Sequence, residues 1–233
     1  MPPRLPDLAN WSFAAVYEPA GEAVLVGGDF YDWFMIGDGR LVFLIGDVCG
    51  NGPAAGTAGF SIRKALKGVA AAQPDPALWL DLVERAVEVE LAEMRFASVL
   101  VAILDRQGGA ELHRAGHPLP WMLGRTHSHV VGVPGRAVLG VGSGPAVPPT
   151  RLRLEPGETM LMFTDGLVEA RAPGGRMLEA PLWDKLSSAT PFGSAVEVVL
   201  TIDAFVGHAS ETGLKDDAIY AALTYTGQDG VGA

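Results

Sequence analysis

A predicted β-hairpin near the N-terminus constrains this sequence more than any other feature. Two runs of mostly apolar and aromatic residues, 29–36 and 40–47, flank the turn Gly37–Gly39. A glycine-rich turn between two strand-like runs is a strong hairpin signal. Both faces of the two runs are largely apolar, so both strands should be buried on both sides. The segment therefore predicts two central strands of a covered sheet.

The remaining pattern predicts an antiparallel α+β protein. We expect helices at 53–72 and at 76–94, and a third helix from a capping box at Ser194 and Glu197 to residue 206. In the second helix Asp75 is the expected N-cap, and the expected buried stripe is Trp79, Leu82, Val83, Ala86 and Val87. A further strand is expected at 13–26, with a turn at Pro19–Gly21, and others at 96–104, 110–115, 120–123, 129–133, 151–154, 159–164 and 217–225. Most connections are hairpins, which favours antiparallel sheets over a doubly wound fold.

Composition narrows the class of function. The 233-residue chain has a formal net charge of −10, which disfavours nonspecific binding to nucleic acid or to anionic membranes. Its single cysteine, Cys49, excludes an internal disulfide framework and fits a reducing, cytoplasmic setting. The N-terminus has no apolar signal segment, and no apolar run is long enough to span a bilayer. We expect one domain over residues 1–226, followed by a loose tail at 227–233.

Acidic residues fall where the expected strands begin or end. Asp47 and Asp165 each follow an apolar run, and Asp216 and Asp217 precede the last one. In an antiparallel sheet, the end of one strand lies beside the start of its neighbour. A single strand-end Asp followed by Gly is usually only a turn, but together these acids predict a shared cluster at one sheet edge.

The hairpin sharpens this prediction. Asp29 lies nine residues before Asp38 in the turn, and Asp47 lies nine residues after it. The two acids should therefore face each other, with Cβ atoms about 5 Å apart. Asp32, three residues from Asp29, should point to the opposite face. Two facing carboxylates repel unless a cation neutralises them.

A divalent cation is the simplest way to neutralise such a cluster. Carboxylates without cysteine or clustered histidine select hard ions such as Mg²⁺ or Mn²⁺. Two such ions, about 3.5–4 Å apart, can share a water and lower its pKa toward neutrality. The spacing of the acids thus indicates metal-assisted attack by water on phosphorus.

The motifs around these acids resemble a known enzyme family. Segments VGGDFYDWFMIGDGRLVFLIGDVCGNGPAAG, RFASVLVAILD, RAGHPLPWML, VLGVG, ETMLMFTDGLVEAR and DDAIYAAL follow one another through nearly the whole chain. In order and spacing they resemble the SpoIIE-type branch of the PPM metal-dependent protein serine/threonine phosphatases, bacterial regulators of sigma-factor partner switching. The resemblance implies an αββα sandwich, in which two antiparallel sheets are flanked by helices.

The resemblance also implies roles for individual residues. Asp47 corresponds to the acid that bridges two metals, and Val48 to the residue whose backbone carbonyl is a ligand. Asp165 and Asp216 correspond to further metal ligands, and Asp29 to an acid near the second metal. The implied cofactor is Mn²⁺ or Mg²⁺, with two ions.

The implied reaction is hydrolysis of phosphoserine or phosphothreonine in a protein, with an anti-anti-sigma factor of the STAS type as substrate. One alternative is a catalytically weak binding module in a partner-switching pathway. Another is a metal-dependent phosphohydrolase for small molecules. By the same resemblance, residues 53–94 are a switch region and a possible homodimer interface. His117 is interpreted as part of a turn rather than as a general acid.

Overall fold

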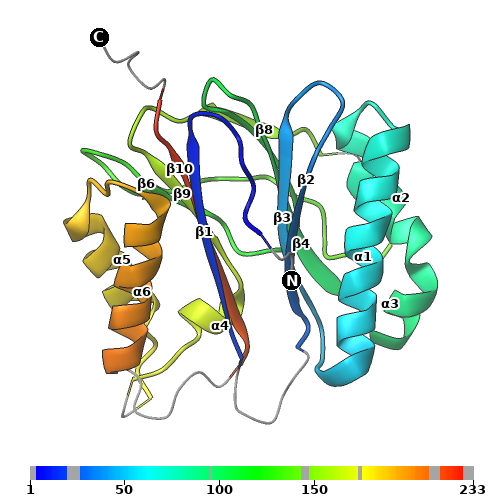
Figure 1. The fold of residues 1–233 in the computed structure, drawn as a ribbon. Coiled ribbons are helices and arrows are strands. Elements are labelled where there is room, and N and C mark those ends of the chain that lie inside the picture. Colours follow the sequence, from blue (N-terminus) through cyan, green and yellow to red (C-terminus); the bar gives the residue numbers. More distant parts are fainter. Residues whose placement is uncertain are drawn as a thin grey trace.

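The protein is a four-layer sandwich in which two sheets lie face to face between helices (Figure 1). The computed structural model describes residues 4–19, 27–94, 96–142, 147–172, 175–209 and 216–227. One sheet has the strand order β2-β3-β4-β5-β8, and the other has the order β1-β10-β9-β6-β7. Every strand pairing within the two sheets is antiparallel. The predicted α+β, αββα architecture is confirmed.

The first sheet is built from local hairpins. Its strands are β2 (Asp29–Met35), β3 (Leu41–Val48), β4 (Ala97–Leu104), β5 (Gly109–Ala115) and β8 (Thr150–Arg153). The register pairs Met35 with Leu41 and Asp29 with Asp47, so the predicted hairpin is confirmed along its whole length. Its turn includes Gly39, whose φ of 81° is a conformation that glycine adopts without strain.

The second sheet joins the two ends of the chain. Its strands are β1 (Trp11–Glu18), β10 (Ala218–Tyr225), β9 (Thr159–Phe163), β6 (Trp121–Leu123) and β7 (His129–Val130). The first strand was expected over 13–26 with a turn from Pro19; β1 ends at Glu18, directly before that position, and residues 20–26 lie outside the described part of the chain. Of the predicted tail, only Gly227 lies within the described residues.

Side chains alternate between the two faces of each strand, and this alternation divides the buried residues into separate cores. Inward residues of both sheets, such as Phe43, Leu100 and Leu223, form one cluster between the sheets. Outward residues of the first sheet pack against α1–α3, and those of the second sheet pack against α5 and α6. Strands that are buried on both faces explain why the central segments read as continuous apolar runs.

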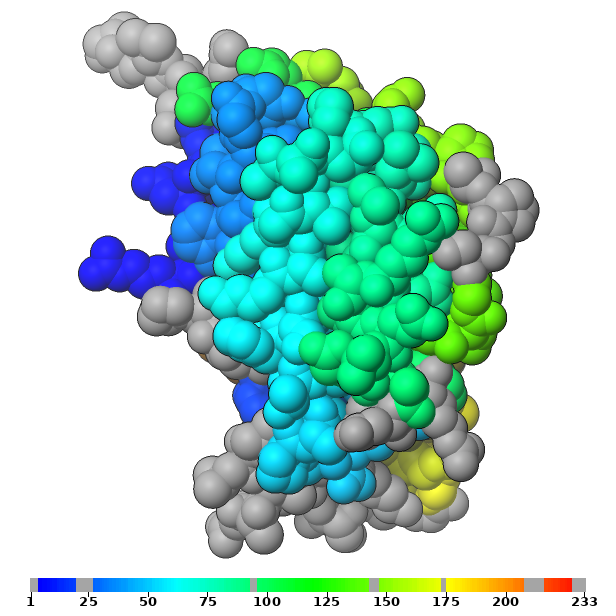
Figure 2. All heavy atoms as spheres, turned by 90° about the vertical axis from the view of Figure 1, so that its right-hand side faces the viewer, coloured from blue at the N-terminus to red at the C-terminus, as the bar shows by residue number. Residues whose placement is uncertain are grey.

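Three helices cover the outer face of the first sheet, where they form one continuous layer (Figure 2). Helix α1 (Gly52–Ala72) matches its prediction. The helix predicted at 76–94 is instead a 3-10 turn at Pro76–Leu78, capped by Asp75, then α2 (Trp79–Ala86) and α3 (Glu88–Met94). The break falls at Val87, and the β-branched residues there and at position 89 have low helix propensity.

The helical stripe prediction was wrong in part. Leu80 and Glu84 are buried in α2 in place of Leu82 and Ala86. A hydrophobic pattern could not predict the burial of Glu84, because this residue is charged and forms a buried ion pair with Arg136.

The helices α4 (Asp165–Val168), α5 (Glu179–Ala189) and α6 (Ala195–Ala209) follow β9, and the last two pack on the second sheet. The backbone N–H of Glu197 donates to Ser194 Oγ over 3.4 Å, consistent with the predicted helix start. Within the described residues, no helix has the length and apolar character needed to cross a membrane.

Candidate metal centre

The inner face of the first sheet ends in two carboxyl groups. Tyr31 and Trp33 of β2 contact the core between the sheets, and Asp29 has the same strand parity. The register places Asp29 directly opposite Asp47 of β3. The predicted opposition of the two acids is confirmed, and both lie on the face that meets the second sheet.

Asp29 also connects the two sheets. Its Oδ2 atom accepts a hydrogen bond of 2.7 Å from the Thr164 hydroxyl, at the end of β9. The sequence argument placed all the acids along the edge of one antiparallel sheet. Instead, Asp29 and Asp47 come from the first sheet, while Asp165 and Asp216 lie beside strands of the second. The acids therefore meet where two sheet edges face each other.

Asp165 and Asp216 are the exposed members of this group. Asp165 is the first residue of α4, directly after Thr164, the helix N-cap. Asp216 directly precedes Asp217 and accepts a hydrogen bond of 2.9 Å from its backbone N–H. The charges of Asp165 and Asp216 both raise the pKa of Asp47. The four acids thus share one electrostatic environment.

Three oxygen atoms converge beside Gly28. A Cβ atom on Gly28 would be 2.2 Å from the Val48 carbonyl oxygen and 2.9 Å from Asp47 Oδ1. The Gly50 carbonyl oxygen would be 3.0 Å from it. A Cβ atom here would collide with the Val48 carbonyl oxygen, so this position requires glycine. Gly50 was not among the predicted ligands, because nothing in a sequence marks which backbone carbonyl turns toward a site.

The facing carboxyls resist ionisation. Burial is the main cause that raises the pKa of Asp29, and the Thr164 hydroxyl only partly opposes it. The charges of Asp47 and Asp165 raise this pKa further. Burial also raises the pKa of Asp47, followed by the charge of Asp165. The carboxyl groups of the centre therefore disfavour each other's ionisation.

The donor set fits a hard divalent cation. Carboxylate and carbonyl oxygens are the ligands that Mg²⁺ and Mn²⁺ prefer. Within the described ranges, no ion pair joins a Lys, Arg or His to Asp29, Asp47, Asp165 or Asp216. In the same ranges, no three His, Cys, Asp or Glu side chains are arranged to hold a metal ion. The backbone carbonyl oxygen of Val48 lies close to Asp47 Oδ1, beside Gly28.

Asp217 was predicted to lie in the acidic cluster but was not among the predicted metal ligands. It is 6% exposed, while Asp216 is largely exposed. The Tyr17 hydroxyl donates to Asp217 Oδ2 over 3.2 Å, and a Cβ atom on Gly27 would overlap that oxygen. Strand parity could have identified Asp217, because it continues the inward series of Ile219 and Ala221.

Asp32 lies on the other face, as predicted. Its Oδ2 atom is 2.8 Å from Lys67 Nζ and 4.0 Å from an Arg63 guanidinium nitrogen, both on α1. Asp32 is thus neutralised within the protein and attaches α1 to the sheet.

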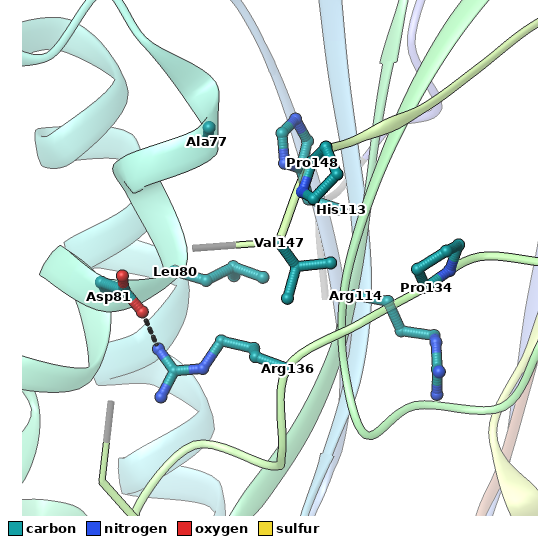
Figure 3. Close-up of a pocket in the computed structure, with 9 residues that line it drawn as sticks. All are labelled: Ala77, Leu80, Asp81, His113, Arg114, Pro134, Arg136, Val147 and Pro148. Carbon is teal, nitrogen blue, oxygen red and sulfur yellow. Dashed lines mark hydrogen bonds and ion pairs between the residues drawn. The ribbon is translucent and has the colours of Figure 1, made fainter. Parts of the chain in front are cut away.

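A second pair of acidic residues, Asp81 and Glu84, lies on α2. Asp81 and Glu84 both accept hydrogen bonds from Arg136, and Glu84 also accepts one of 2.6 Å from the Gly140 backbone N–H. Burial opposes ionisation of Glu84, but these donors outweigh it and lower its pKa. Figure 3 shows Arg136 directed at Asp81 beside a small cavity. This cavity has a volume of about 20 Å³, space for roughly one water, so it is no substrate site.

Comparison with known proteins identifies the family and the fold. Residues 37–226 match the family model of Stage II sporulation protein E (SpoIIE). The chain belongs to the SpoIIE family. Among curated proteins, the SpoIIE-family chain is 29% identical over 202 residues to Protein IcfG of Synechocystis sp. (strain ATCC 27184 / PCC 6803 / Kazusa). That match covers 74% of this chain and 31% of IcfG.

Solved structures place this SpoIIE-family chain among PP2C phosphatase domains. The RsbU and RsbW domains of Rv1364c from Mycobacterium tuberculosis match with a TM-score of 0.77 and 28% identity, over 95% of this chain and 63% of that one. The PP2C phosphatase domain of SpoIIE from Bacillus subtilis matches with a TM-score of 0.77 and 18% identity, over 92% and 62%. RsbX in complex with magnesium matches with a TM-score of 0.67 and 16% identity, over 95% and 98%.

These matches confirm the predicted family and fold. SpoIIE-family and PP2C domains are protein serine/threonine phosphatases, and PP2C phosphatases are metal-dependent. The chain spans about a third of IcfG and under two thirds of the mycobacterial and Bacillus chains.

Proposed function

We propose that this chain hydrolyses phosphoserine or phosphothreonine in a protein substrate by means of a metal-activated water. The observation that carries the proposal is the group of oxygen atoms from Asp47, Val48 and Gly50 that converges beside Gly28. No positive side chain among the described residues pairs with the acids around it. A site of this kind is suited to bind divalent cations.

The residues that would hold Mg²⁺ or Mn²⁺, as two ions, are Asp29, Asp47, Val48 through its carbonyl, Asp165 and Asp216. When bound, the metal would lower the pKa of water and neutralise the phosphoryl oxygens. The Thr164 hydroxyl orients the Asp29 carboxylate by donating to its Oδ2 atom. Because the pKa values of Asp29 and Asp47 are raised, these carboxyls would release protons as a cation binds.

The location of the centre supports a protein substrate. Asp165 and Asp216 are exposed. An open edge can accept a phosphorylated side chain that projects from another protein. The mycobacterial relative carries an RsbU and an RsbW domain in one chain, which supports a protein partner. A STAS-type anti-anti-sigma factor, as the family resemblance implies, is the substrate we propose.

The test is phosphate release from a phosphoserine peptide, a phosphorylated STAS protein and a nucleotide, each titrated with Mn²⁺. We expect metal-dependent turnover of the phosphoprotein that Asp47→Asn abolishes while the fold is retained. Activity that persists in Asp47→Asn would refute the metal assignment. Faster nucleotide turnover would indicate a small-molecule phosphohydrolase. Calorimetry that detects no Mn²⁺ binding would favour the binding-module alternative.

A further inference from the structure

A threonine of the second sheet contacts an acid of the first. Thr164 directly follows β9, and its hydroxyl donates a hydrogen bond of 2.7 Å to Asp29 Oδ2. Thr164 is fully buried and Asp29 is 8% exposed, so little water competes for this bond. The two residues are 135 positions apart and belong to different sheets. The bond therefore links the position of one acid of the metal centre to the packing of the sheets.

Thr164 is itself fixed by the neighbouring strand β10. Its backbone N–H donates to the Ile219 carbonyl over 2.9 Å, and the Ile219 N–H donates to Thr164 Oγ1 over 2.8 Å. An amide N–H only donates, so the hydroxyl oxygen is the acceptor of the second bond. The hydroxyl hydrogen has two acceptors within reach, Asp29 Oδ2 at 2.7 Å and the Ile219 carbonyl at 3.5 Å. Only the contact with Asp29 has the length of a normal hydrogen bond between oxygens.

The contact persists in both protonation states of Asp29. A metal-bound carboxylate is ionised and only accepts hydrogen bonds, so the hydroxyl is the donor whenever an ion is present. A protonated Asp29 can instead donate to the hydroxyl, and the same two oxygen atoms remain joined. In either state Thr164 engages the Oδ2 atom of Asp29.

An engaged oxygen limits how a carboxylate binds a cation. Chelation of one ion by both oxygens of Asp29 would require Oδ2 to weaken its bond with Thr164. Ca²⁺ takes about 6–8 oxygen ligands in flexible geometry and commonly uses both oxygens of a carboxylate, whereas the smaller Mg²⁺ demands near-octahedral geometry. Mn²⁺ lies between these two ions in size and also favours six oxygen ligands. A carboxylate that a rigid partner fixes at one oxygen therefore favours the smaller ions.

We propose that Thr164 is a positioning residue that makes the metal centre selective for Mg²⁺ or Mn²⁺ over Ca²⁺, because it fixes one oxygen of Asp29 from the second sheet. This role rests on the proposed metal site. It goes beyond that site in naming the residue that determines which cation the site prefers. Thr164 needs no contact with the metal or the substrate for this role.

The chain offers a matched control at the other end of β9. Thr159 is also fully buried, and its hydroxyl is hydrogen-bonded to that of Thr224 over 2.7 Å. Thr159→Val and Thr164→Val both replace a buried hydroxyl with a methyl group and keep the shape of the side chain. A general loss of stability affects both variants, whereas an effect on metal binding is expected only at position 164.

The first measurement is calorimetric binding of Mn²⁺ and of Ca²⁺ to the wild-type protein. We expect Mn²⁺ to bind more tightly than Ca²⁺. Ca²⁺ that binds as tightly as Mn²⁺ would overturn the selectivity, and this result does not depend on the folding of any variant.

The second measurement repeats both titrations on three variants. In Thr164→Val the Asp29 carboxylate loses its fixed partner, so we expect Mn²⁺ affinity to fall about tenfold and Ca²⁺ affinity to change by less than about threefold. Thr164→Ser keeps the hydroxyl and should keep the wild-type ratio of Mn²⁺ to Ca²⁺ affinity. Thr159→Val should change neither affinity. If Thr164→Val does not fold, Thr164→Cys replaces it, because a thiol is only a weak hydrogen-bond donor.

The outcomes separate this role from the proposed function. Equal losses of Mn²⁺ and Ca²⁺ affinity in Thr164→Val, or no loss of either, overturn the selectivity and leave the phosphatase proposal standing. A change of the ratio in Thr164→Ser as large as in Thr164→Val has the same consequence, because the hydroxyl would not be its cause. A wild-type protein that binds neither ion overturns the metal site and the role of Thr164 together.

Discussion

Asp29 and Glu84 are buried to nearly the same degree, but their pKa values are shifted in opposite directions. They are 8% and 7% exposed, so burial disfavours the charge on both. The pKa of Asp29 is nevertheless raised, whereas that of Glu84 is lowered. The difference lies in the neighbours. Glu84 accepts hydrogen bonds from Arg136 and from backbone N–H groups, while Asp29 faces Asp47 and has one hydroxyl donor in Thr164.

The comparison distinguishes Glu84, which forms a structural ion pair, from Asp29, which belongs to the candidate metal centre. The cluster of Glu84, Asp81 and Arg136 is balanced by the protein itself and joins α2 to the loop at 131–142. Among the described residues, Asp29 and Asp47 have no such ion pair, and the pKa values of both are raised. Perturbed carboxyls in such a setting mark candidate sites of function. Four substitutions test this contrast.

The largest effect should come from Asp47→Asn. Loss of one carboxylate from a metal centre should lower kcat/KM by at least about 100-fold, because metal binding and charge neutralisation fail together. The measurement is phosphate release at saturating Mn²⁺, with circular dichroism to verify the fold. Asp38→Asn is the matched control, since it makes the same chemical change in the exposed turn of the same hairpin. Equal losses in both variants would contradict a special role for Asp47.

Arg136→Met should give the largest loss of stability. Removing the Arg136 guanidinium leaves the buried Glu84 and the half-buried Asp81 without their positive partner, which costs about 3 kcal/mol near neutral pH. Because the pKa of Glu84 is lowered in the folded state, the wild type gains this stability above the ordinary value of 4.5 and loses it as the pH falls through the folded value. The deficit of the variant should therefore shrink in acid. Denaturant unfolding near pH 7 and pH 4 measures it, and equal deficits at both would refute the ion-pair account.

Asp29→Asn should increase the folding stability of the metal-free protein, in contrast to the loss expected for Arg136→Met. A raised pKa means that the folded state binds more protons, so wild-type stability declines as the pH rises above the ordinary value of 3.8. The neutral amide removes this penalty, and we expect a gain on the order of 2 kcal/mol at about pH 8 and less at about pH 5. Thermal unfolding with a chelator present checks the gain. A variant less stable than the wild type at the higher pH would show that Asp29 is compensated after all.

Lys67→Met should have the smallest effect. The Lys67 ammonium is partly exposed and Arg63 still approaches Asp32, so we expect a loss of under about 1 kcal/mol. Mn²⁺ affinity should not change, because Asp32 faces α1. Calorimetry that finds weaker Mn²⁺ binding would place Asp32 within the metal centre and remove the contrast between the two faces of β2.

Much of the local structure could be predicted from the sequence. The hairpin register that opposes Asp29 to Asp47 follows from the turn position, and the opposite direction of Asp32 follows from strand alternation. Helix α1 and the Asp75 cap were also predictable. The motif order was sufficient to predict the family. In each case the signal lies within a few residues or in a fixed spacing.

The meeting of the two sheets was decided by tertiary structure. Sequence periodicity says which face of a strand is buried, but it does not say which distant segment covers that face. The contact of Thr164 with Asp29, the burial of Asp217 beside Tyr17, and the pairing of Glu84 with Arg136 each join residues more than 50 positions apart. The sequence by itself determined which acids exist and where their strands end. Only packing of the sheets and helices decided which acids gained a compensating cation, because compensation depends on distance in space rather than along the chain.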